Sequence, residues 1–222
     1  MSDHHDHGHT HEHGGRHRHP VQPDHDDTLT YYRKLEIAVR ELLIAKGVTT
    51  ADEIRQLVED IESRTPEGGA RVVARAWADA AFKDSLLRDA TAACESMGFE
   101  MALYDVKLTV VENTPTVHNM IVCTLCSCYP RMLLGLPPAW YKSLAYRSRA
   151  VREPRAVLRE FGLELPESVS VRVHDSTADL RYLVLPMRPA GTEGWSEHQL
   201  ASIINRDSMI GTALVKAPQT VT

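Results

Sequence analysis

The stretch Ile121–Pro130, IVCTLCSCYP, holds three of the four cysteines of the chain within six residues. Cys123, Cys126 and Cys128 form the pattern C-x-x-C-x-C, where a β-branched run ends and a loop begins. Loops that follow strands often carry functional groups. In a chain without a secretion signal, clustered cysteines favour metal or redox chemistry over a structural disulfide.

Several kinds of site use closely spaced cysteines. A structural zinc site or a cubane iron–sulfur cluster needs a fourth ligand, which Cys94 or His118 would have to supply. A thioredoxin-like pair needs only two of the three cysteines. None of these sites accounts for a third cysteine that stands two residues after the second.

A curled loop offers another answer. Three side chains from six residues reach one ion only if the loop wraps around it. The amide nitrogens of Ser127 and Cys128 are then the two further local ligands, because a strongly polarising ion lowers the pKa of the groups it binds. The product is a claw of two nitrogens and three sulfurs with one open position, which is typical of catalysis.

Composition narrows the function classes. The chain has 222 residues, enough for a core and an extension, and a formal net charge of −5. No long basic face is evident, so we expect no nucleic-acid partner. The apolar runs are too short to span a membrane, and the N-terminus lacks the apolar segment of a signal peptide. We therefore expect a cytoplasmic protein with no membrane partner.

The N-terminus is rich in histidine. Nine of the twelve histidines stand in the first 25 residues, interspersed with Asp, Glu and Gly. Such a segment cannot bury enough apolar surface to fold, so residues 1–27 are predicted to be a disordered tail. It is either a low-affinity reservoir for a transition metal or simply a solvated tail, in part a tag remnant.

The N-terminal half is predicted to be helical, as an arm over residues 28–104. Residues 28–47 have a helical apolar period and end at Gly47, and Thr50 and Glu53 have the spacing of a capping box. Residues 69–98 predict one or two further helices, in which Cys94 is a small core residue.

The C-terminal half, residues 105–222, is predicted to be a layered α+β domain that carries the claw. Helices are expected at 140–162, with a start or break at Pro154, and at 196–207, with Ser196 as N-cap. The β-branched or alternating runs predict strands at 105–113, 118–124, 168–176, 180–186 and 208–215.

Several blocks carry a family resemblance. VCTLCSCYP, with LGLPPAWYKS, YRSRAVREPRAVLREFGLEL, RYLVLPMRPAGTEGW and RDSMIGTAL, closely resembles the α subunit of nitrile hydratase, most densely over residues 106–214. The γ subunit of thiocyanate hydrolase shares the claw and is the rival. The resemblance implies an α+β catalytic domain that works in a hetero-oligomer.

The resemblance also implies the metal and its ligands. One low-spin cobalt(III) ion per chain, or iron(III) as the alternative, would be held by Cys123, Cys126 and Cys128 and by the amides of Ser127 and Cys128. Cys126 would become a sulfinic acid and Cys128 a sulfenic acid. Thr124 and Tyr129 resemble the cobalt variant.

The implied reaction is hydration of a small nitrile to an amide. The metal acts as a Lewis acid, and the sulfenate oxygen or a bound hydroxide attacks the nitrile carbon. The side chain of Ser127 is a candidate for substrate contact. A β-type subunit, as one chain or two smaller ones, would supply arginines that hydrogen-bond the oxidised sulfurs.

Two departures from the family bear on the substrate. Cobalt members usually have tryptophan at the position of Arg131, beside the substrate pocket, and thiocyanate hydrolase γ subunits resemble this chain there. The stretch GFEMALYDVKL also lacks a glutamine that the family often has. The hypotheses are therefore nitrile hydratase, then thiocyanate hydrolase, with a metal-trafficking protein as a non-enzyme alternative.

The remaining conspicuous residues are interpreted as structural. Trp140 and Trp195 are expected to pack, and His118 to be a satisfied polar residue. Arg172 and Arg181 are expected to form ion pairs with Asp175 or Asp179. The residues expected at a subunit interface or next to the core are Tyr146, Arg147, Arg149 and Arg152.

Overall fold

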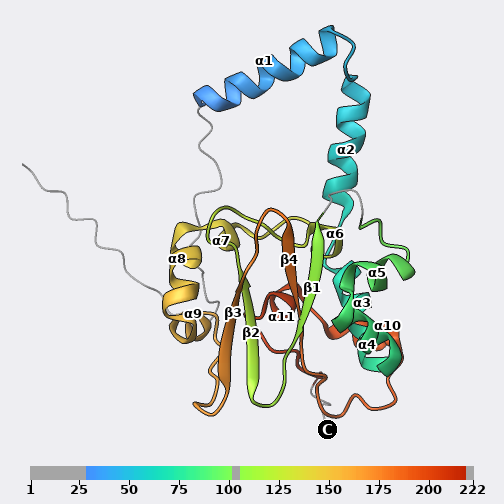
Figure 1. Cartoon of the computed structure of the whole chain (residues 1–222), viewed down its shortest axis with the longest axis vertical. Helices are drawn as coiled ribbons and strands as arrows, with labels where there is room; N and C mark the ends of the chain where they lie inside the picture. Colours follow the sequence, from blue (N-terminus) through green and yellow to red (C-terminus); the bar gives the residue numbers. More distant parts are fainter. Residues whose placement is uncertain (1–28, 102–105, 219–222) are drawn as a thin grey trace, which may run out of the picture.

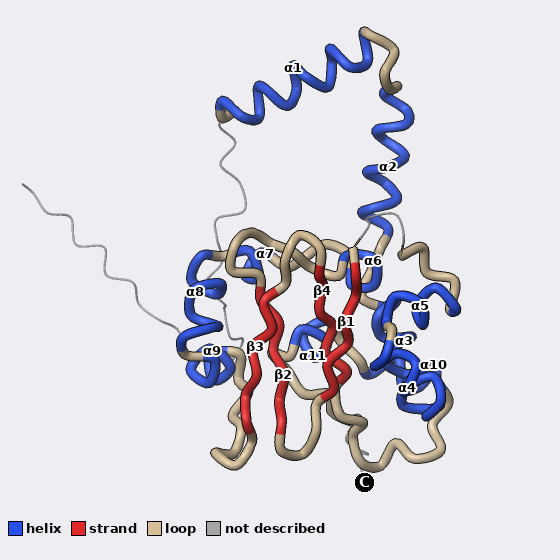
Figure 2. Tube along the Cα trace, in the orientation of Figure 1, coloured by secondary structure: helices blue, strands red, loops and turns tan. Residues whose placement is uncertain are grey.

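A computed structural model describes residues 29–101 and 106–218 of the chain (Figure 1). Its four described strands form two parallel pairs, which lie side by side with β2 next to β4 (Figure 2). The pairs are β1 (Lys107–Glu112) with β4 (Leu180–Leu185), and β2 (Val117–Val122) with β3 (Ser170–Asp175). This layer of strands among helices confirms the predicted α+β class.

Helices cover both edges of the strand layer (Figures 1 and 2). On the β1 side lie α3 (Glu67–Ala78), α4 (Ala80–Arg88), α5 (Ala90–Ser96) and α10 (Glu197–Ile203). Near β2 and β3 lie α7 (Ala139–Lys142), α8 (Leu144–Arg152) and α9 (Pro154–Glu160). The short helices α6 (Arg131–Leu134) and α11 (Arg206–Ile210) pack on α3. One continuous apolar core lies between these helices and the strands.

The first two helices project away from this core (Figure 1). Neither α1 (Tyr31–Ala45) nor α2 (Ala51–Ser63) has a buried residue. The predicted capping box is present, because Thr50 accepts from the Glu53 amide while Glu53 accepts from the Thr50 amide. No helix among the described residues is long and apolar enough to cross a membrane. The predicted tail, residues 1–27, lies outside the described residues.

The segment after α2 is broken more often than the sequence analysis predicted. Three helices, α3 to α5, replace the one or two expected over 69–98. The cause is two aspartates: Asp79 and Asp89 each end one helix and cap the next, accepting from the amides of Phe82 and Ala92. These helices share the core with the strands. The boundary predicted near residue 104 stays a prediction.

The C-terminal half differs from expectation in two places. The helical segment 140–162 divides, because Ser143 caps α8 and Pro154 starts α9. The strand predicted at 208–215 is wrong: Asn205 caps α11 there, and Gly211 ends it in the left-handed conformation, with φ +90°. Local capping outweighs the β-branched pattern at this point. The N-cap predicted at Ser196 is confirmed.

Gly211 also meets the strand that carries the cysteines. Its carbonyl accepts a hydrogen bond of 2.7 Å from Nε2 of the buried His118, on β2. His118 Nδ1 then accepts from the Asn113 amide at 3.3 Å, so the ring is neutral and satisfied, as expected. Burial lowers the pKa of His118. A Cβ at Gly211 would meet the Asn119 carbonyl oxygen at 2.0 Å.

We expect Gly211→Ala to lower the free energy of unfolding by more than about 2 kcal/mol, because positive φ and a backbone clash add together. The matched control is Gly191→Ala, where φ is +80° but nothing lies within 4 Å of the added Cβ. Positive φ alone costs the control about 1 kcal/mol. Urea unfolding of the chain measures both. Equal losses would show that α11 moves away from β2 without penalty.

Candidate metal centre

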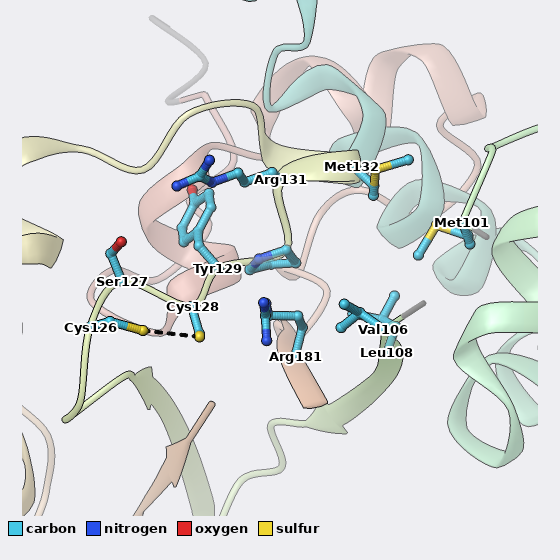
Figure 3. A pocket seen from close by; sticks show the side chains of 11 residues that line it. Met101, Val106, Leu108, Cys126, Ser127, Cys128, Tyr129, Arg131, Met132 and Arg181 are labelled. Atoms are coloured by element: carbon cyan, nitrogen blue, oxygen red, sulfur yellow. Dashed lines mark hydrogen bonds between the residues drawn. The ribbon is translucent and has the colours of Figure 1, made fainter. Parts of the chain in front are cut away.

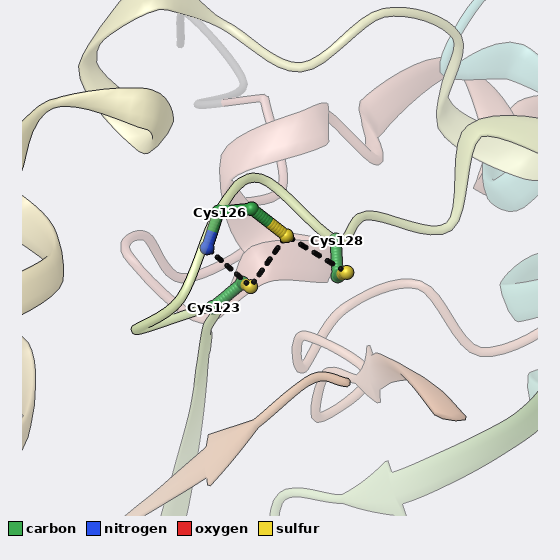
Figure 4. Close-up of side chains that lie close together, drawn as sticks. All are labelled: Cys123, Cys126 and Cys128. Carbon is green, nitrogen blue, oxygen red and sulfur yellow. Dashed lines mark hydrogen bonds between the residues drawn. The ribbon is translucent and has the colours of Figure 1, made fainter. Parts of the chain in front are cut away.

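The three clustered cysteines lie on one loop at the carboxyl end of β2 (Figure 4). The strand ends at Val122, and the loop that follows, residues 123–128, is called the claw loop below. Pro130 and α6 close it on the other side. A buried strand at one end and a short helix at the other therefore hold a loop whose tip, Leu125 and Cys126, is exposed.

The sulfurs of the claw loop lie close together. The distance from Cys123 Sγ to Cys126 Sγ is 3.5 Å, and that from Cys126 Sγ to Cys128 Sγ is 3.2 Å. Cys123 and Cys128 are buried, whereas Cys126 is exposed. In the part of the chain that the structure describes, these three form the one group of His, Cys, Asp or Glu side chains arranged for a metal ion.

The backbone also points at the sulfurs. The amide of Cys126 donates to Cys123 Sγ at 3.2 Å, and the amides of Ser127 and Cys128 lie near enough to Cys126 Sγ to affect its pKa. The Cys128 thiol and these donors lower the pKa of Cys126 to about 7. Burial, followed by the hydrogen bond to Cys126, raises the pKa of Cys128 to about 12. The amides of Ser127 and Cys128 are thus close to the Cys126 sulfur.

The sulfur separations can be compared with metal geometries. Two sulfurs about 2.3 Å from an ion lie about 3.3 Å apart at a right angle and about 3.8 Å apart at the tetrahedral angle. The Cys126–Cys128 separation of 3.2 Å is near the right-angle value, and the Cys123–Cys126 separation of 3.5 Å lies between the two. The two side chains considered as a fourth ligand lie elsewhere. Cys94 is buried in the core, and His118 hydrogen-bonds the Gly211 carbonyl. Among the described residues, the three sulfurs therefore have no fourth side-chain ligand beside them for a tetrahedral zinc site.

A carboxylate of the neighbouring strand fixes the start of the claw loop. Asp175 accepts from the Thr124 amide at 2.9 Å and from the Thr124 hydroxyl at 2.5 Å. Asp175 ends β3 and pairs in register with Val122, so both strands deliver their ends to the same place. The sequence analysis assigned Asp175 to an ion pair with an arginine. Knowledge that β2 and β3 pair in parallel would have indicated Thr124 as its partner.

A cavity of about 310 Å³ borders the claw loop (Figure 3). Cys126, Ser127, Cys128 and Arg131 line it, so the structure brings together the predicted site residues other than Cys123. Its apolar wall comes from the stretch without a glutamine and from α6. The wall residues are Met101, Val106, Leu108 and Met132.

Arg181 is a pocket residue that the sequence analysis missed. It is the second residue of β4, lies beside the end of the claw loop and lines the cavity (Figure 3). Its positive charge opposes the rise in the pKa of Cys128. No carboxylate of the described residues pairs with it; its guanidinium donates to the carbonyls of Thr177 and Ala178. The expected ion pair is therefore wrong, because the turn before β4 occupies its donors.

The other conspicuous residues have structural partners. Trp140 lies in a cluster of aromatic rings with Tyr141, Tyr146 and Phe161, and Trp195 packs against the core. Arg149 binds Glu153 and Glu160 on the surface. These contacts agree with the structural interpretation of the two tryptophans and Arg149.

Two of the arginines lie at the claw loop or the adjacent helix. Arg147 donates to the carbonyl of Leu125 at 3.4 Å, at the exposed tip of the claw loop. Arg152 donates to the Ser148 carbonyl within α8. Their expected place at a subunit interface stays a prediction.

The chain matches the family described as nitrile hydratase, alpha chain, over residues 30–213. It is 52% identical over 182 residues to the low-molecular weight cobalt-containing nitrile hydratase subunit alpha of Rhodococcus rhodochrous, covering 82% of this chain and 87% of that protein. It is 44% identical over 197 residues to the thiocyanate hydrolase subunit gamma of Thiobacillus thioparus, covering 84% and 81%.

A solved structure agrees with these relatives. A double histidine mutant of the Fe-type nitrile hydratase from Comamonas testosteroni Ni1 superposes with a TM-score of 0.78 and 45% identity, over 84% of this chain and 91% of that one. Sequence and fold thus agree over most of the chain. It belongs to the nitrile hydratase alpha-chain family.

Proposed function

We propose that this chain is the catalytic α-type subunit of a nitrile hydratase, which adds water to a nitrile to give an amide. One observation carries the proposal. The sulfurs of Cys123, Cys126 and Cys128 lie 3.5 and 3.2 Å apart in sequence order, and Cys126, Ser127 and Cys128 border a cavity that accommodates a small organic molecule. Family membership and the cobalt-containing relatives support it.

The donor set fits one trivalent metal ion. Cys123, Cys126 and Cys128 would supply sulfur, and Ser127 and Cys128 would supply amide nitrogen. Cobalt(III) is the proposed ion, since the relatives at about half identity are cobalt-containing and Thr124 and Tyr129 follow the cobalt pattern; iron(III) is the alternative. Bound there, the ion supplies Lewis acidity toward the nitrile nitrogen.

The two sulfurs at the cavity are the proposed sites of oxidation. Cys126 is exposed, so an external oxidant can reach its sulfur and convert it to sulfinic acid. Cys128 lines the cavity from a buried position, where oxidation beyond sulfenic acid meets more steric restriction. Cys128 would thus carry its single oxygen on the side where the substrate enters.

The cavity walls orient the substrate. Met101, Val106 and Leu108 provide an apolar surface for the organic group and exclude water from it. Ser127 lines the same cavity next to the sulfurs, where its hydroxyl can hydrogen-bond the nitrogen end of the substrate. Arg131 and Arg181 provide positive charge at the entrance and beside Cys128.

A β-type subunit, as one chain or two smaller ones, is the proposed partner. The α1 and α2 helices expose apolar side chains without covering each other or the core. Leu42 is 54% exposed, Leu57 52% and Leu125, at the tip of the claw loop, 82%. Such a surface favours a permanent partner. We propose a cytoplasmic hetero-oligomer with an arm over 28–104 and a catalytic domain over 105–222.

Thiocyanate hydrolysis is the second candidate. Arg131 and Arg181 bring two positive charges to one small cavity, which favours an anion. The relative from Thiobacillus thioparus has this name. A metal-trafficking role is the third candidate, and it requires reduced thiols and a freely exchanging ion.

We expect the native complex to contain one cobalt per chain and the chain to carry about three added oxygens, two on Cys126 and one on Cys128. Elemental analysis and intact mass measure these quantities, and peptide mapping places the oxygens. Cys94 is the internal control and should stay a thiol. Four reduced cysteines in an active complex would contradict the claw chemistry, and stoichiometric iron or zinc would contradict cobalt.

We expect nitrile hydration by the co-expressed complex and none by the cobalt-loaded single chain, because the arginines that would hold the oxidised sulfurs belong to the partner. Amide formation from small nitriles and consumption of thiocyanate are assayed side by side. Turnover by the single chain at the rate of the complex would remove the need for a partner. Faster turnover of thiocyanate than of any nitrile would favour the second candidate.

A further inference from the structure

Two buried tyrosines hold the two ends of the claw loop. The Tyr146 hydroxyl donates to the carbonyl of Ile121 at 2.7 Å, two residues before Cys123. The Tyr141 hydroxyl donates to the carbonyl of Cys128 at 2.9 Å. The two rings are neighbours, with centroids 5.6 Å apart. One cluster of aromatic side chains therefore contacts both ends of the claw loop.

This aromatic cluster is well packed. Tyr141 is fully buried and Tyr146 is 5% exposed. Trp140 stacks edge-on against Tyr146 at 4.9 Å and against Phe161 at 4.6 Å, while Tyr129 contacts Tyr141 at 5.1 Å. A tyrosine side chain has only two torsions, and neighbours on several sides leave them little freedom. The two hydroxyls are thus fixed donors.

Between these points the claw loop makes polar contacts to Asp175 and Arg147 but has little apolar packing. Leu125 is 82% exposed, and Cys126 is exposed. Cys128, in contrast, offers both Sγ and its amide nitrogen, and the carbonyl held by Tyr141 belongs to the same residue. A shift of the Cys128 Cα, which the hydrogen bond to its carbonyl restrains, would move both donor atoms together. The ends of the loop therefore determine where the sulfurs lie.

We infer that Tyr141 and Tyr146 are positioning residues, which hold Cys123 and Cys128 in a metal-binding arrangement before the ion arrives. The inference rests on the proposed function of the claw loop as a metal site. It assigns the LGLPPAWYKS segment a task beyond packing: its tyrosine determines the geometry of the last claw residue. Groups outside the ligand set that orient the ligands commonly change metal affinity or activity tenfold or more.

The test removes one hydroxyl and keeps the ring. Tyr141→Phe in the full chain should bind cobalt(II) about tenfold more weakly, with shifted thiolate-to-cobalt absorption bands. In the matured complex fewer chains should carry all their oxygens, and kcat should fall more than KM rises. The matched control is Tyr182→Phe on β4, since the Tyr182 hydroxyl has no hydrogen bond among the described residues.

The outcomes separate positioning from packing. A lower Tm with unchanged cobalt(II) affinity and absorption would overturn the inference. If Tyr141→Phe does not fold, Tyr146→Phe applies the same measurement to the other end of the loop, and an unchanged spectrum there overturns it as well. Cobalt(II) binding by the full chain does not depend on turnover. Failure of the wild-type complex to hydrate nitriles would therefore contradict the proposed function alone.

Discussion

Replacing Cys128 by alanine is expected to lower kcat for nitrile hydration at least about 10³-fold in the assembled complex. Cys128 is the one residue proposed to provide both a sulfur and an amide nitrogen. Its Sγ lies 3.2 Å from that of Cys126 and borders the cavity. The substitution removes a ligand and the proposed sulfenate oxygen together. Initial rates at saturating nitrile measure the loss, with cobalt content determined on the same sample.

Cys94→Ala is the control for the Cys128 substitution. Cys94 is fully buried on α5, and burial raises the pKa of its thiol to about 12, so it stays a neutral core side chain. Its loss should cost about 1 kcal/mol of stability and leave kcat unchanged. Near wild-type turnover by a cobalt-loaded Cys128→Ala complex would show that Cys128 is not part of the reacting site.

The location of the site followed from the sequence because its signal is local. Cys123, Cys126 and Cys128 stand within six residues, and the preceding β-branched run identifies the end of a strand. The capping box at Thr50 and the helix start at Pro154 are local in the same sense, since each depends on residues within one turn. These features needed no knowledge of tertiary contacts.

The parts that the sequence did not predict depend on distant contacts. Asp175 and Thr124 are 51 residues apart and meet only because β2 and β3 pair in parallel. Arg181 reaches the cavity because β4 pairs in parallel with β1, where its register partner Leu108 also lines the cavity. The helix α11 replaced a predicted strand because caps at Asn205 and Gly211 outweighed its apolar residues. Strand order and capping decided each case.

The cavity combines two kinds of wall. One side is apolar, formed by residues of the β1 region and Met132, and the other carries Arg131 and Arg181. Arg181 cannot be exchanged simply, because its guanidinium also holds the turn before β4. Arg131 makes no side-chain hydrogen bond among the described residues and is exposed. It is therefore the residue through which selectivity can be changed with little effect on the fold.

We expect Arg131→Trp to raise kcat/KM for simple aromatic nitriles about tenfold and to lower it for polar or anionic substrates such as thiocyanate. A guanidinium offers fixed charge and a fork of donors, whereas an indole offers a flat apolar wall that continues the one made by Met132. Steady-state kinetics of the assembled variant with benzonitrile, a polar nitrile and thiocyanate measure the change in selectivity.

Arg159→Trp is the matched control, because Arg159 is exposed on α9 and does not line this cavity. It introduces the same side chain and loses the same charge, so it separates an effect in the cavity from an effect of net charge or of an added surface indole. The ratio of kcat/KM for benzonitrile to that for thiocyanate should change in Arg131→Trp and stay constant in Arg159→Trp. An equal ratio in both variants would mean that Arg131 turns toward the partner subunit, and the choice between nitrile and anion would then rest on Arg181.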